Sequence, residues 1–73
     1  MPVGMTLAQW LSLGLLREAR EAFEAGALRT IEAADDRVVG LPRQGRGHQV
    51  LGIASSREEA VVIATILRMN NPG

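Results

Sequence analysis

The chain has 73 residues, and its eight arginines balance eight carboxylates, so the formal net charge at pH 7 is zero. This balance excludes a long-range field that would draw the whole molecule towards nucleic acid or an anionic membrane. Cysteine is absent and His48 is the single histidine, which excludes disulfides, cysteine catalysis and the usual structural zinc sites. We expect one domain spanning residues 1–73, with no metal and no cofactor.

The apolar N-terminal stretch, residues 1–16, raises the question of a signal peptide or a membrane helix. No basic residue precedes Arg17, and no small-x-small cleavage site follows it. A membrane helix needs about 18 consecutive apolar residues, and Gln9, Ser12 and Arg17 interrupt this run. The sequence therefore predicts no contact with a membrane, and the lack of cysteine fits a reducing, cytoplasmic location.

The first predicted helix begins at Thr6, which has the spacing of a capping box with Gln9. It should run to about Ala25, because Gly26 supplies the left-handed residue that ends many helices. Gly14 in the middle costs about 1 kcal/mol relative to alanine, so its presence predicts that a neighbouring backbone packs closely there. The stripe expected to cover the sheet consists of Leu11, Leu15, Ala19, Ala22 and Phe23.

Three short segments have the composition of strands, separated by turn-forming residues. Apolar and polar residues alternate least well in residues 28–33, and best in residues 48–54, the clearest strand. The strand of residues 37–41 ends at Pro42, because proline has no N–H to donate to the neighbouring strand. In the last segment, alternation places Leu51 and Ile53 on one face and Val50 and Gly52, with His48 and Ala54, on the other. Short connections between the three strands predict an antiparallel sheet.

The last predicted helix begins at Ser56, which forms a second capping-box pattern with Glu59. The sequence Asn70-Asn71-Pro72 should end it. The predicted fold class is therefore α+β, in the order helix, three-stranded antiparallel sheet, helix, with both helices packed on one face of the sheet.

Both helices carry more apolar surface than one sheet face covers. Residues 7–16 are apolar nearly all round the first helix, and between residues 60 and 69 only Thr65 and Arg68 are polar. Large exposed apolar patches usually mark an interface, so we expect a homo-oligomer, most simply a two-fold dimer. The alternative is that loops and termini of the same chain cover these residues. The candidate interface residues are Trp10, Leu13, Val62, Ile66 and Met69.

Arginine and glycine are combined between the second and third strands, in residues 42–47. Arg43 and Arg46 are suited to bind a phosphate while glycine amides approach it, but no nucleotide-binding motif matches, because no lysine follows and no helix begins after the glycines. The alternative is a mobile hairpin loop that the arginines keep soluble. Ser56 and Arg57 form a second anion candidate at a helix start, and capping alone also explains Ser56.

His48 follows this loop, and histidine is the residue type that most often acts as a general base near neutral pH. Such a base needs an oriented partner group, and Asp35 and Asp36 supply one only if their turn lies close to His48 in the fold. We therefore expect a non-enzymatic chain. A small ribonuclease that depends on His48 is the least favoured hypothesis. The alternative is that His48 is an ordinary histidine at the surface, without a catalytic role.

The order helix, three strands, helix resembles the double-stranded-RNA-binding domain. Residues 56–64 are similar to the opening of that family's last helix, a small residue and basic residues followed by alanines facing the sheet. The resemblance implies this fold and, for activity, RNA phosphate contacts by Arg57. Glu58 and Val61 stand where that family has further basic residues. The sequence thus predicts a self-associating interaction module, with RNA binding as the alternative. The matching residues are Ser56, Arg57, Ala60 and Ala64.

Overall fold

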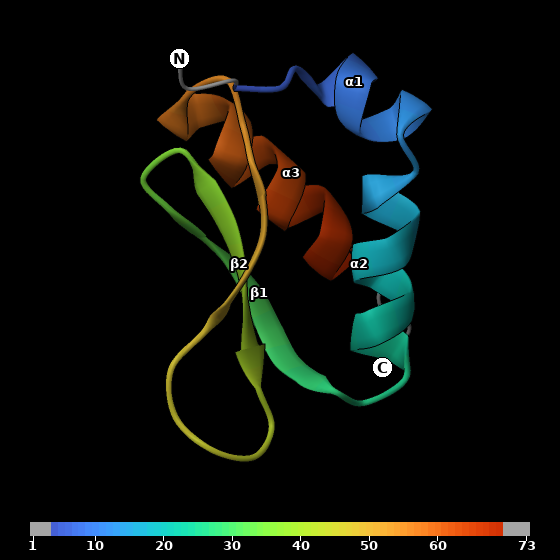
Figure 1. The fold of residues 1–73 in the computed structure, drawn as a ribbon, viewed down its shortest axis with the longest axis vertical. Helices are drawn as coiled ribbons and strands as arrows, with labels where there is room; N and C mark the ends of the chain where they lie inside the picture. Colours follow the sequence, from blue (N-terminus) through green and yellow to red (C-terminus); the bar gives the residue numbers. More distant parts are fainter. Residues whose placement is uncertain (1–3, 70–73) are drawn as a thin grey trace.

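The computed structural model describes residues 4–69. The strands form one antiparallel sheet in the order β1-β2-β3, and the helices pack on one of its faces (Figure 1). This confirms the predicted α+β class. The predicted helix end at Asn70-Asn71-Pro72 lies outside the described residues. In chain order the elements are α1 (Leu7–Ser12), α2 (Leu15–Glu24), β1 (Leu28–Ala34), β2 (Arg37–Pro42), β3 (Gln49–Ile53) and α3 (Arg57–Met69).

The first helix is divided into α1 and α2 at Leu13 and Gly14, so the prediction of one continuous helix was wrong. Gly14 has a φ of 74°, a conformation that glycine adopts without steric cost. A Cβ at this position would meet no atom within 4 Å, so the expectation of close packing was also wrong. The turn itself requires the glycine. The break explains why Leu11, predicted to cover the sheet, is 62% exposed.

The predicted Thr6–Gln9 capping box forms in full, whereas Ser56 caps α3 through only one of the two bonds of its predicted box. The Gln9 N–H donates to Thr6 Oγ1 (3.2 Å), and the Thr6 N–H donates to Gln9 Oε1 (2.9 Å). At the start of α3, the Glu59 N–H donates to Ser56 Oγ (3.1 Å). These bonds satisfy backbone donors that a helix start otherwise leaves free.

An irregularity in the pairing of β2 with β3 decides which side chains of β3 face the core. Val38 pairs with Gly52 and Val39 pairs with Val50, so one step along β2 matches two steps along β3 and Leu51 is the additional residue. Gly52 therefore faces the helices with Val38, while Val50 faces the other side. The simple alternation expected for this strand, with Val50 and Gly52 on one face, was wrong.

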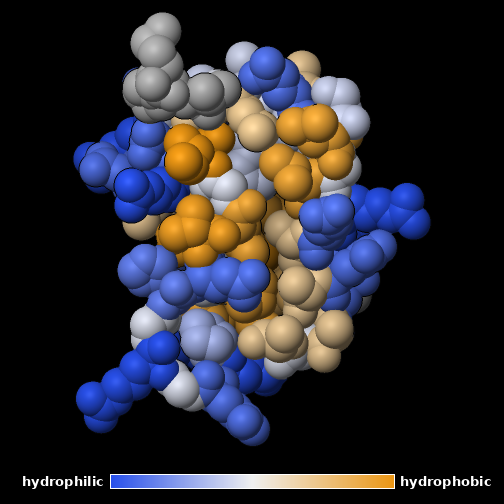
Figure 2. All heavy atoms as spheres, in the orientation of Figure 1, coloured by the Kyte–Doolittle hydropathy of each residue, from blue (hydrophilic) through white to orange (hydrophobic). Residues whose placement is uncertain are grey.

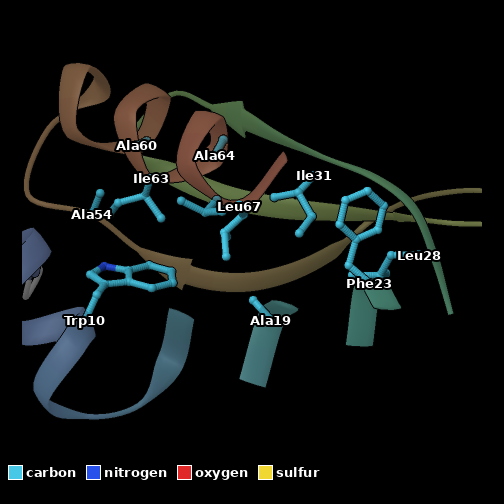
Figure 3. Close-up of a cluster of buried hydrophobic side chains, with 11 residues drawn as sticks. Trp10, Ala19, Phe23, Leu28, Ile31, Ala54, Ala60, Ile63, Ala64 and Leu67 are labelled. Carbon is cyan, nitrogen blue, oxygen red and sulfur yellow. The ribbon is translucent and has the colours of Figure 1, made fainter. Parts of the chain in front are cut away.

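The core fills the space between the helices and the sheet, and Figure 3 shows Trp10 of α1 and Ala19 of α2 lying below the side chains of α3. Trp10, Ile31 and Ile63 are completely buried. No helix in the described part of the chain is long and apolar enough to cross a membrane. The side chains that form the cluster are those of Trp10, Ala19, Phe23, Leu28, Ile31, Val38, Ala54, Ala60, Ile63, Ala64 and Leu67.

Candidate functional site

A groove of about 550 Å³ runs along α2 beside α3. Part of its lining is apolar and comes from three helices, which places the end of α1 and the second half of α3 at the same surface. The rest of the lining consists of charged side chains of α2. The apolar residues are Leu11, Leu16, Ile66 and Leu67, and the charged ones are Arg17, Arg20, Glu21 and Glu24.

Further large apolar side chains are exposed on α3 and at the end of α1, the elements that supply part of the groove's lining. Leu13 is 59% exposed, Val62 47% and Met69 78%. Val62, Ile66 and Met69 are spaced i, i+4, i+7 on α3 and form a stripe turned away from its buried side. In Figure 2 apolar surface extends over α3 and the region of α1, with charged side chains around it. We call the surface formed by Leu11, Leu13, Val62, Ile66 and Met69 the helical patch.

Trp10 does not belong to this surface, which corrects its place among the interface candidates. It is completely buried, and a Cβ on Gly52 would overlap its ring. Trp10 Nε1 and Glu59 Oε1 are buried without a hydrogen-bond partner in the described part of the chain. Trp10 is therefore a packing residue of the single chain. Leu13, Val62 and Met69 are exposed as the interface prediction requires, and Leu11 is an additional exposed residue that the prediction missed.

The four anion candidates do not gather at one place. Arg43 and Arg46 lie in the loop before β3, whereas Ser56 and Arg57 lie beyond its other end, at the start of α3 (Figure 1). Ser56 Oγ is already engaged as a helix cap. The loop and the helix start are therefore two separate surfaces, and a ligand would contact them together only by spanning the length of β3.

Backbone conformation accounts for the glycines of the loop without a ligand. Gly45 and Gly47 have φ values of 89° and 91°, where other residues are strained. The Arg43 N–H donates to Ala27 O (3.3 Å), which ties the start of the loop to the segment after α2. Arg43 and Arg46 are exposed, and neither belongs to an ion pair within residues 4–69. Their guanidinium groups are therefore accessible to an anion.

His48 and the turn after β1 line one hollow of about 440 Å³ on the sheet face away from the helices. The catalytic hypothesis requires His48 to lie close to Asp35 or Asp36, but the sheet register separates them. His48 precedes Gln49, which pairs with Gly40, whereas the turn precedes Arg37, which pairs with Ile53, so they lie towards different ends of β2. Among the described residues, no hydrogen bond joins His48 to Asp35 or Asp36, and no three histidine or acidic side chains are grouped to hold a metal ion. The hollow is lined by Ala34, Asp35, Asp36, Arg37, Val39 and His48.

No protein-family model matches the chain, and no curated protein or solved structure shows significant similarity to it. The resemblance to the double-stranded-RNA-binding domain therefore stays a prediction.

Proposed function

We propose that this chain is a non-enzymatic interaction module that forms a homodimer through the helical patch. The observation that carries the proposal is the exposure of Leu11, Leu13, Val62 and Met69 on α3 and at the end of α1, next to the elements that line the groove. A small single domain rarely leaves a continuous apolar surface of this kind in water. Closed two-fold pairs are the commonest assemblies of soluble chains, and a second copy brings the same apolar surface to the contact.

Burial of the helical patch alone gives about as much free energy as association costs, so the dimer needs polar contacts as well. Complete burial of one large apolar side chain contributes about 1.5–3 kcal/mol, and these side chains are already partly covered in the single chain. Their remaining burial in two copies amounts to about 10 kcal/mol, which is comparable with the cost of about 4–15 kcal/mol for losing free rotation and translation. Polar contacts at the same surface therefore decide the orientation of the pair.

The solution mass tests this proposal. Light scattering on the purified chain at micromolar concentration should give twice the single-chain mass of 7.8 kDa. A single-chain mass under these conditions would refute self-association as the function of the patch.

The accessible arginines of the loop support a second proposal, RNA binding through Arg43 and Arg46. Because such binding displaces counterions from phosphates, its affinity falls steeply with salt. Retention of labelled RNA at low salt should disappear in the Arg43→Ala/Arg46→Ala variant. Absence of retention by the unchanged chain, or full retention by the double variant, would eliminate this proposal.

A further inference from the structure

Four charged side chains of α2, Arg17, Arg20, Glu21 and Glu24, follow an order that the dipole of the helix does not favour. The amino end of a helix favours acidic side chains and the carboxyl end basic ones. Glu18 in the first turn of α2 follows this rule, but the last turn has no basic residue. The Arg17 Nε–Glu21 Oε1 (3.2 Å) and Arg20 Nε–Glu24 Oε1 (2.9 Å) ion pairs both place arginine first, which is the weaker orientation of an i,i+4 pair. The stability of α2 alone therefore does not explain this order.

The same four residues form one stripe that borders the groove and the helical patch. Their order is self-complementary about the point midway between Arg20 and Glu21. If a second α2 lies beside the first in the opposite direction, position 17 meets position 24 and position 20 meets position 21. Every arginine then faces a glutamate. A parallel alignment in register would instead place like charges side by side.

We propose, resting on the homodimer proposed above, that α2 packs antiparallel to α2 of a second copy, with the two-fold axis passing near Arg20 and Glu21. Arg17 then faces the partner's Glu24, and Arg20 faces the partner's Glu21. The antiparallel arrangement also sets the positive end of each helix dipole beside the negative end of the other. The charge order that is the weaker one within a single helix is favourable across the pair.

These ion pairs select the orientation of the dimer, whereas the helical patch supplies most of the attraction. All four charged side chains are exposed in the single chain, and exposed ion pairs contribute little affinity. Charge complementarity nevertheless rejects wrong alignments by placing like charges together. The partner that fits this stripe is a second copy of the same chain, because it brings the same charge order in reverse.

Cysteine cross-linking tests the register, and the absence of native cysteine makes each cross-link unambiguous. An equimolar mixture of Arg17→Cys and Glu24→Cys chains should form a disulfide-linked pair under mild oxidation. Either variant alone should cross-link roughly tenfold less, because two copies of position 17 lie about 10 Å apart along the helix axis, beyond the Cα separation of about 7 Å that a disulfide spans. Cross-linking of Arg17→Cys alone as efficiently as the mixture would overturn the antiparallel register.

Charge exchange separates pairing between copies from pairing within one chain. Arg20→Glu and Glu21→Arg should each raise the dimer dissociation constant about tenfold, because like charges then face each other across the axis. The Arg20→Glu/Glu21→Arg double variant should return to within about threefold of the unchanged chain, although it places like charges at both i,i+4 positions of its own helix. A double variant weaker than both single variants would overturn the inference.

Cross-linking tests the register and the solution mass tests the homodimer, so failure of one proposal can be told from failure of the other. A two-chain mass together with the wrong cross-links overturns the register and leaves the homodimer proposal standing. A single-chain mass of the unchanged protein overturns both.

Discussion

Trp10 of α1 lies against Gly52 of β3 so closely that a Cβ at position 52 would overlap the indole ring. Gly52 faces the core because the additional residue in β3 reverses the alternation at this point. The contact joins the first helix to an edge strand that lies about forty positions later in the sequence. The Trp10 ring can occupy this position only because residue 52 is a glycine.

Gly52→Ala should lower the free energy of unfolding by about 1–3 kcal/mol, because overpacking forces the ring or the strand to move. Denaturation followed by circular dichroism measures this change. In a Trp10→Leu background the same alanine should cost less, since the smaller side chain leaves room for the methyl group. Equal costs in the two backgrounds would show that the ring is not what excludes the Cβ.

Gly14→Ala should destabilise the chain by about 1–2 kcal/mol, because alanine is strained at a φ of 74°. Gly14→Asn should cost less, since asparagine tolerates this conformation better. The order of the two melting temperatures distinguishes conformation from packing. If Asn, the larger residue, were the more damaging, close packing at Gly14 would be the correct explanation after all.

Ser56→Ala should lower stability by about 1 kcal/mol through loss of the cap on the Glu59 N–H. We expect the same variant to leave RNA retention unchanged, because the loop that carries Arg43 and Arg46 lies beyond the other end of β3 (Figure 1). Comparing its melting temperature with its RNA retention checks both statements. A loss of retention without a loss of stability would return Ser56 to the list of anion-binding residues.

Features set by a few neighbouring residues could be predicted from the sequence. Thr6 and Gln9 form the expected capping box at the start of α1, and Ser56 caps α3 as expected. The three strands lie close to the predicted ranges. The exposure of Leu13, Val62 and Met69 followed from counting apolar residues against the surface that one sheet face covers.

Features that depend on tertiary structure were not predicted correctly. The helix break needed knowledge of the φ of Gly14, and the additional residue Leu51 in β3 changed which side of the sheet its neighbours face. Trp10 was assigned to the surface because the projection assumed one straight helix, whereas α1 turns this side chain into the core. The charge order along α2 is visible in the sequence, but the sequence does not show that these residues line a groove together with Leu11 and Ile66 of the helical patch.

The most direct test of the dimer compares two neighbouring valines of α3. Val61 and Val62 are both 47% exposed, but Val61 lines a different hollow, beside Glu32 and Arg68, and Val62 belongs to the helical patch. Light scattering at micromolar concentration should give a two-chain mass for Val61→Asp and a single-chain mass for Val62→Asp, with both variants folded by circular dichroism. If Val62→Asp retains the two-chain mass, the helical patch is not the surface through which this protein associates.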